Sequence, residues 1–307
     1  MVDRSFTINS RLGDNIGRPE NATFLFDRPV VARDQDFDEL VRLGDRHRLE
    51  GNAAKAERLL REALAIAEDD SPREPRKLTE ALNILGILCK DLAKYDEAFT
   101  LYSRALWLAE HAESVDEREV ATLYHNLGGI EHARRNYAAG EPLARKGLEI
   151  RRRLADGSET ALAQDMVALA AILDGQQKFD ESEGLYVDAL RILDREPEAN
   201  AGEIAVALND LGAHYAQRDQ IDRANDLLTR AAELKTKTLG PRHPDVGVTL
   251  NNLAIVHKRR GDFARATALY RDAVGIFEEA LGPDHPKALA CRRNLARCDA
   301  DARELPG

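Results

Sequence analysis

The sequence predicts an all-α fold: a right-handed α-solenoid of six helix-turn-helix repeats followed by a C-terminal capping helix. Three observations support this prediction. The chain of 307 residues repeats itself every 42 residues, each unit carries two helical stripes of apolar residues, and one linker phrase occurs twice. Repeats of this length are typical of extended arrays in which each unit packs on its neighbours.

Five columns stay in register, without gaps, when the sequence is shifted by 42 residues. One column holds leucine in seven units, and the column after it holds only glycine or alanine. A second leucine column and two more columns of small residues run through six units. The seven leucines are Leu43, Leu85, Leu127, Leu169, Leu211, Leu253 and Leu295. Small residues allow helices to approach closely, and leucines fill the space between them.

Within one unit the apolar residues follow two helical stripes. Leu250, Leu253 and Ala254 share one face with the spacing i, i+3, i+4. After the turn "RRGD" a second stripe begins at Phe263 and returns at Ala266. Each unit is therefore predicted to be two helices joined by a tight turn. One such pair has too little apolar surface to be stable alone, so neighbouring pairs are expected to stack.

A linker phrase, LGPxHP, separates helix pairs near the C-terminus. It occurs as "LGPRHP" and "LGPDHP", 42 residues apart. Gly240 and Gly282 are expected to take the left-handed conformation that ends a helix, and the proline after each prevents the helix from continuing. The second proline, Pro244 or Pro286, suits the first turn of the next helix, where a missing N–H costs little.

The columns of the helix pairs resemble those of the tetratricopeptide repeat family. The positions that match the family pattern in the second unit are Leu82, Leu85, Gly86, Ala98, Tyr102 and Ala105. The 42-residue spacing, the "LNNLA" at 250–254 and the two linkers resemble the kinesin-light-chain subtype in particular. The resemblance covers about residues 37–303. It implies a helical solenoid whose concave groove holds an extended peptide or a helix of a partner protein.

The two ends of the chain depart from the repeat. Residues 1–36 have no partner in the period and contain the apolar stretch "TFLFDRPVV", so we expect this arm to pack on the solenoid or in its groove. Residues 37–303 form the predicted solenoid, and residues 304–307 form a short tail. The last helix has Arg292 and Asp299 where earlier units carry core residues, which indicates a solvating cap.

Composition narrows the class of partner and compartment. The net charge of −10 argues against general nucleic-acid binding. The sequence has no run of about 18 apolar residues, so no membrane span is expected. The N-terminus lacks the apolar region of a secretory signal, and the three cysteines form no CxxC pair. These features favour a cytoplasmic protein with reduced thiols. The oligomeric state stays open.

The sequence carries no catalytic signature: no glycine-rich phosphate loop, GxSxG, HExxH or CxxC. We therefore predict no catalytic residue, no cofactor and no metal site. His47 and His257 fall on a core column and are expected to be buried. Glu131 also falls on a core column and would need a partner there. Cys291 and Cys298 are interpreted as small packing residues, not a redox pair.

The resemblance implies that the first helix of each pair lines the concave surface and that one column points into the groove. That column holds Asn83, His125, Val167, Asn209, Asn251 and Arg293. The three asparagines match the groove asparagines of the family, and a side-chain amide can pair with the backbone of an extended peptide. Val167, beside Met166 and Ala168, departs from this pattern and indicates an apolar patch in the middle of the groove.

Basic residues continue the same face one and two turns further on. They are Lys90, His132, Lys258 and Arg297, and Arg259 and Arg293 add to them. We expect the C-terminal third of the groove to be basic, which favours an acidic residue or a free carboxylate on the bound protein or peptide. The alternative is that these residues are solvated helix charges without a ligand.

Trp107 is the one tryptophan of the chain, and it falls on a column that otherwise holds mainly polar or small residues. A tryptophan at such a solvent-facing position is expected to be covered, either by the N-terminal arm or by a partner protein. We prefer the arm.

Three functions are consistent with these features. The leading hypothesis is a non-catalytic scaffold that binds a protein or an extended peptide in the concave groove. The alternative is a regulatory sensor that binds a small peptide or a metabolite there and signals by protein contact. The third is an enzyme on the same scaffold, for which no pair of nucleophile and base is visible.

Overall fold

The computed structural model describes residues 30–70, 74–154 and 159–304, which form thirteen α-helices and no strand. The helices are α1 (Val30–Leu49), α2 (Ala53–Asp70), α3 (Pro75–Asp91), α4 (Tyr95–Glu110), α5 (Glu117–Ala133), α6 (Tyr137–Arg153), α7 (Glu159–Gly175), α8 (Phe179–Leu193), α9 (Ala201–Gln217), α10 (Ile221–Leu239), α11 (Pro244–Arg259), α12 (Phe263–Leu281) and α13 (Pro286–Arg303). Twelve of them form six consecutive pairs, and α13 follows alone. The predicted all-α solenoid of six repeats and a capping helix is confirmed.

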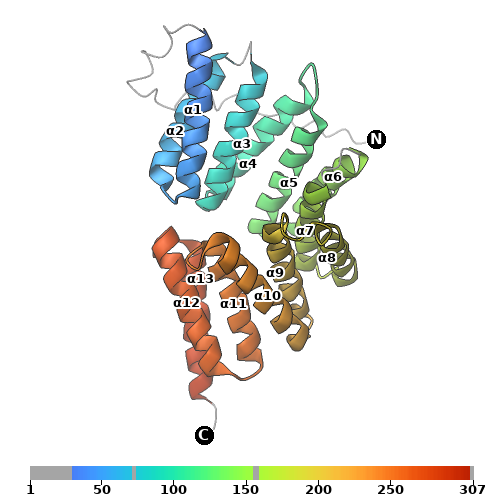
Figure 1. Ribbon diagram of the computed structural model, residues 1–307, viewed down its shortest axis with the longest axis vertical. Helices are drawn as coiled ribbons and strands as arrows, with labels where there is room; N and C mark the ends of the chain where they lie inside the picture. Colours follow the sequence, from blue (N-terminus) through green and yellow to red (C-terminus); the bar gives the residue numbers. More distant parts are fainter. Residues whose placement is uncertain (1–29, 71–73, 155–158, 305–307) are drawn as a thin grey trace.

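The six pairs stack in sequence order into a right-handed solenoid that curves strongly (Figure 1). Each helix packs mainly on the other member of its pair and on the neighbouring pairs. The array runs from α1 at the top, through α5 to α8 on the right, and back to α11 to α13 at the lower left. The last helices therefore return toward the end of α3, and the concave face is enclosed by the curve.

The arm and tail fall mostly outside the described residues. α1 begins at Val30, ahead of the predicted boundary at residue 37, so residues 30–36 belong to the first helix. The placement of residues 1–29 stays a prediction. α13, the last helix, ends at Arg303.

Columns of small residues let the paired helices touch. A Cβ atom added at Gly86 would lie 2.6 Å from the ring of Tyr102, and one added at Gly212 would lie 2.7 Å from Leu228. Tyr102 is fully buried. Glycine thus leaves the space that the large residue of the second helix fills, which is the physical reason for the Leu-Gly pair in the repeat.

The turn inside each pair holds one residue with positive φ at a constant column. The residues are Ala93, Arg135, Gln177 and Asp219, with φ between +57° and +61°, and Gly51 and Gly261 at the two ends of the array. A side chain in the left-handed conformation costs roughly 1–2 kcal/mol. The stacked helices on either side impose this turn even where glycine is absent.

The two LGPxHP linkers have nearly the same geometry. Gly240 has φ +87° and ψ 156°, and Gly282 has φ +90° and ψ 156°, so each ends its helix with positive φ as predicted. The high ψ is a correction: the backbone is extended there, not left-handed helical, a region open almost only to glycine. Each linker histidine caps the next helix, because the Nδ1 atom of His243 or His285 accepts a hydrogen bond from a backbone N–H at 3.2 Å.

Several residues predicted to be buried are found in the core. The carboxylate of Glu131 is 3% exposed and accepts hydrogen bonds from Arg134 Nη1 at 2.8 Å and Asn136 Nδ2 at 2.6 Å, which confirms the expected pairing. His257 is buried, whereas His47 is only partly buried and contacts Glu50. All three cysteines are buried free thiols. None of the helices in the described ranges has the length and apolarity needed to cross a bilayer.

Candidate functional site

The concave face contains a pocket of about 560 Å³. Residues from seven helices and from the linker before α13 line it. The residues are Lys90, Asp91, Tyr95, His125, Gly129, His132, Ala133, Gln164, Val167, Ala168, Ala171, Leu193, Gly202, Glu203, Val206, Asp210, His285 and Lys287. Its volume lies in the range of small-molecule and peptide side-chain sites.

The middle of the pocket is apolar. Val167, Ala168 and Ala171 come from α7, and Val206 comes from α9. Val206 is 42% exposed, so its side chain is accessible to a ligand in the pocket. This is the region where the sequence indicated an apolar patch in the groove.

Lys90 and His132 form a basic corner of the pocket. Burial lowers the pKa of Lys90, and the positive charge of Lys287 lowers it further, against the opposing effect of Asp91. Burial also lowers the pKa of His132, and the charge of Lys90 adds to that shift. Neither side chain has a hydrogen-bond or ion-pair partner among the residues the structure describes. A negative group placed between them would favour both charged forms.

His125 lines the same pocket, and a buried carboxylate behind it fixes the orientation of its ring. Its Nδ1 atom is 2.8 Å from Oδ1 of Asp165, a carboxylate that is 3% exposed. The other oxygen of Asp165 accepts a hydrogen bond from Arg151 Nε at 3.0 Å. This buried chain orients the imidazole, so His125 presents its Nε2 side toward the pocket.

The acidic residues of the pocket have hydrogen-bond partners of their own. Arg48 donates to Asp91 at 3.0 Å, and Asn209 Nδ2 donates to Asp210 at 2.8 Å. Burial raises the pKa of Asp210, so its charge is disfavoured. Gln164 donates to Glu203 at 3.3 Å. The charged groups left without a partner are therefore the cations.

Each predicted groove asparagine accepts a hydrogen bond from an asparagine of the following helix pair or cap. Asn126 donates to Asn83 at 2.9 Å, and Asn294 donates to Asn251 at 3.1 Å. Within the described ranges, the Nδ2 groups of Asn83 and Asn251 have no partner. These two amides can still donate to a bound backbone.

Asn209 is the exception among the three. It is 5% exposed, and its Oδ1 accepts from Thr249 Oγ1 at 2.9 Å and from Asn252 Nδ2 at 3.2 Å. Its Nδ2 is used by Asp210. Asn209 therefore joins repeats and supports Asp210, and its amide is engaged on both sides.

The basic residues of the C-terminal third lie outside the pocket. Lys258 Nζ is 2.6 Å from Asp301, and Arg259 donates to the backbone oxygen of Ala216. Arg293 and Arg297 are exposed, without an ion-pair partner among the described residues. Of the predicted site residues, the structure thus brings Lys90, His125 and His132 together, and it places Asn83, Asn209, Asn251, Lys258, Arg293 and Arg297 elsewhere on the array.

Sequence reasoning missed seven polar lining residues: Asp91, Tyr95, Gln164, Glu203, Asp210, His285 and Lys287. His285 was interpreted as linker punctuation, and it is indeed the N-cap of α13. The curvature of the whole array brings His285 close to α3. The sequence of a single repeat does not predict this curvature.

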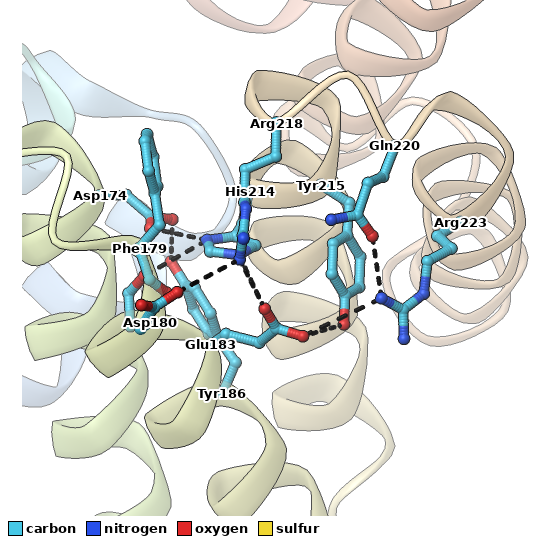
Figure 2. A network of polar contacts seen from close by, with 11 residues as sticks. Asp174, Phe179, Asp180, Glu183, Tyr186, His214, Tyr215, Arg218, Gln220 and Arg223 are labelled. Carbon is cyan, nitrogen blue, oxygen red and sulfur yellow. Dashed lines mark hydrogen bonds and ion pairs between the residues drawn. The ribbon is translucent and has the colours of Figure 1, made fainter.

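A second polar cluster is buried where α7, α8 and α9 meet (Figure 2). The ring of His214 is 0% exposed, and its Nδ1 lies 2.7 Å from Asp174 Oδ1 and 3.3 Å from Ser182 Oγ. Ser182 donates to the same carboxylate oxygen. A nucleophile relay needs the hydroxyl and the carboxylate on opposite ring nitrogens. Here both contact Nδ1, so the cluster is structural.

Glu183 extends this cluster to the surface. It accepts from the hydroxyl of Tyr215 at 2.8 Å and from Arg218 Nη1 at 2.8 Å, and its Oε2 lies 3.7 Å from His214 Nε2. The contacts join three helices and fix how the fourth and fifth repeats meet (Figure 2). This junction holds α7 and α9, which carry the apolar middle of the pocket.

Trp107 is 53% exposed on α4 and stacks on His111, with ring centroids 4.6 Å apart. The arm predicted to cover it lies outside the described residues, so that contact stays a prediction. Among the residues the structure describes, no group of three or more His, Cys, Asp or Glu side chains could hold a metal ion.

Fold and pocket together define a helical-repeat protein with a concave binding surface. Residues 119–195 and 203–279, half of the chain, match the family model described as Tetratricopeptide repeat. The chain belongs to the tetratricopeptide repeat family.

The curated relative Protein KINESIN LIGHT CHAIN-RELATED 1 of Arabidopsis thaliana is 28% identical over 185 residues. That match covers 59% of this chain and 29% of the relative, so the chain spans less than a third of the relative's length. It supports the predicted similarity to kinesin-light-chain-like repeats.

Solved structures share the fold. BtubC (BKLC) from P. vanneervenii has a TM-score of 0.52 and 24% identity, and the match covers 84% of this chain and 94% of that one. NprR in complex with its cognate peptide NprX has a TM-score of 0.66 and 12% identity, over 87% of this chain and 77% of that one. At these identities the likeness concerns the fold alone.

Proposed function

We propose that this protein is a non-catalytic scaffold that binds an extended segment of a partner protein or peptide in its concave groove. One observation carries the proposal: the pocket of about 560 Å³ combines an exposed apolar middle with convergent polar groups at its edge. Such a combination is typical of sites that hold an apolar side chain and fix its orientation by a few polar contacts.

The groups around the pocket suggest how the segment is oriented. An apolar side chain fits against Val167 and Val206, and an acidic residue or a free carboxylate is favoured near Lys90 and His132, which lack partners in the described part of the chain. Further along the groove, the free amide of Asn251 is available to a peptide backbone, and exposed Arg293 to a second negative charge.

A regulatory sensor is the second candidate, and one observation favours it. The pocket is lined by α3 near one end of the array and by the start of α13 at the other. A ligand there touches both the second repeat and the capping helix, so binding and the curvature of the array can be coupled. NprR, a structural neighbour, is described in complex with a peptide, NprX.

Filling the pocket with a bulky side chain tests the proposal. We expect wild-type protein to enrich a family of sequences from a displayed random-peptide library. Val206→Trp should lower the affinity for the enriched peptides at least tenfold, because the side chain at this exposed position extends into the pocket. Val187→Trp is the matched control, since Val187 on α8 is 41% exposed and lies outside the pocket.

Two outcomes would contradict the groove as the binding surface. One is enrichment of no peptide by the folded wild-type protein. The other is equal affinity of both tryptophan variants for the enriched peptides, with circular dichroism showing that each variant keeps its helical content.

A further inference from the structure

The amine of Lys90 reaches from the second repeat to the third. A Cβ atom added at Gly129 on α5 would lie 3.6 Å from Lys90 Nζ, so the nitrogen lies beside the backbone of the next repeat. The same column holds isoleucine in two other repeats, at Ile87 and Ile255. Glycine at this position therefore leaves room for the amine at the wall of the pocket.

The charged groups around this amine leave it without a bonded partner. Burial has the largest effect on the pKa of Lys90 and lowers it, and the charge of Lys287 lowers it further. Asp91 and Asp245 act in the opposite direction, but neither forms an ion pair with Lys90 in the described ranges. The pKa of His132 is lowered as well, by burial and by Lys90. The neutral amine, which is the nucleophilic form of lysine, is thus more populated here than at an exposed lysine.

The space next to the amine is open and apolar. The pocket of about 560 Å³ is lined in its middle by Val167, Ala171 and Val206. The side chain of Lys90 is only partly buried, so a small molecule can reach it. A desolvated amine beside an apolar cavity is the arrangement in which lysines form covalent bonds with carbonyl compounds.

We propose that Lys90 forms a Schiff base with an aldehyde whose apolar group fits the middle of the pocket. This inference goes beyond peptide binding and does not depend on it. An aldehyde is favoured over a ketone because its carbonyl carbon is less hindered and more readily attacked by an amine.

The reaction needs no cofactor and no further reagent. The lone pair of Lys90 Nζ attacks the carbonyl carbon, a C–N bond forms, and the π electrons of the carbonyl move to its oxygen. Both protons of the neutral amine end on that oxygen, which leaves as water, and a C=N bond remains. No group is oxidised or reduced. His132 lies three residues beyond Gly129 on the same face of α5 and is placed to carry these protons.

Reductive trapping with hexanal tests the site. Sodium cyanoborohydride reduces the imine to a stable secondary amine, which adds the mass of the aldehyde less one oxygen atom. Proteolysis and mass spectrometry of the labelled full-length protein locate the adduct. We expect Lys90 to be labelled at least about tenfold faster than Lys237, an exposed lysine on α10 outside the pocket, because the pocket holds the aldehyde beside the amine.

Substitutions assign the labelling to this amine and this pocket. Lys90→Arg keeps the charge but cannot form the imine, so the adduct at residue 90 should be lost while Lys237 keeps its labelling rate. Val206→Trp should slow the labelling of Lys90 by hexanal severalfold, because the indole occupies the apolar middle of the pocket. Val187→Trp is the matched control, since Val187 lies outside the pocket.

Acetaldehyde is the matched control for the probe, because it is too short to fill the apolar middle. Relative to Lys237, Lys90 should react more slowly with acetaldehyde than with hexanal.

Two outcomes would overturn the aldehyde site. One is labelling of Lys90 in the wild-type protein no faster than that of Lys237. The other is fast labelling of Lys90 that is equal for both aldehydes and unchanged in Val206→Trp, since this would indicate a reactive amine without a binding site. Neither outcome bears on the groove as a peptide-binding surface, because hexanal carries no peptide group.

Discussion

The linker before α11 and the linker before α13 are nearly identical in local structure and differ in what surrounds them. In both, a glycine with positive φ ends the helix, a histidine caps the next helix at 3.2 Å, and a proline opens it. His243 is 40% exposed and faces Asp245 at 3.9 Å. His285 has a buried ring nitrogen and lines the pocket beside Lys90.

This difference separates two levels of information in a repeat protein. The linker sequence determines its own backbone, because glycine, proline and the capping side chain act within a few residues. The surroundings of the linker depend on how many repeats precede it, since each adds a small rotation to the superhelix. Two linkers with nearly the same sequence can therefore have different roles. Substitutions can test separately whether the two linkers are equivalent in backbone and whether they differ in their surroundings.

The largest effect is expected at the linker glycines. We expect Gly240→Ala and Gly282→Ala each to lower the free energy of unfolding by about 2 kcal/mol, because φ near +90° with extended ψ strains any side chain. No atom lies within 4 Å of a Cβ added at either position, so the cost is backbone strain and should be equal at both. Urea denaturation measures it. A difference above about 1 kcal/mol between the two variants would show that the linkers are not equivalent in backbone.

Removal of the capping histidines should give a smaller and unequal effect. His243→Ala should cost about 1 kcal/mol, the usual value of an N-cap side chain. His285→Ala loses the same cap but also removes a buried nitrogen without a hydrogen-bond partner, which offsets the loss. Its net change should be closer to zero in the same denaturation experiment. Equal losses at both sites would mean that the ring of His285 is satisfied in solution.

The smallest effect concerns pH. Burial lowers the pKa of His285 in the folded state, so between the two pKa values the folded state binds fewer protons than the unfolded chain does. The stability from this group is present above its unfolded pKa of about 6.5 and is lost as the pH falls through that value toward the folded one. His285→Asn keeps a capping side chain, so its melting temperature should fall less than that of wild type between about pH 7.5 and pH 5. If the melting temperature of His285→Asn depended on pH in the same way as that of wild type, the burial of this ring would be contradicted.

Much of the fold could be predicted from the sequence, because the residues within each repeat determine the helices and turns of that repeat. The Leu-Gly columns, the stripe periods and the linkers gave six pairs and a cap. The pairing of Glu131 followed from its place on a core column. The ψ of Gly240 and Gly282 was not foreseen, since both glycine conformations satisfy the same sequence rule.

The candidate site was predicted only in part, for the same reason. Lys90, His125 and His132 share one face of the first helices, and that face lines the pocket. Asn209 looked identical to Asn83 in the alignment of repeats, yet Thr249 and Asp210 engage its amide. The buried cluster at the fourth and fifth repeats had a signal: Ser182 and His214 are polar residues in columns that hold small or apolar residues in every other unit from the second onward. Two such exceptions indicate a pair.

The return of α13 to α3 has a consequence for local unfolding of the array. An open array frays from either tip, since its outermost pair is secured on one side only. A peptide that contacts both α3 and α13 would close the helices from α3 to α13 into a ring, so the C-terminal helices would no longer be a free end. α1 and α2 lie outside this ring and would still unfold locally. Hydrogen exchange should then slow in the last repeats as much as in the middle ones, even though no bond between adjacent helices has changed.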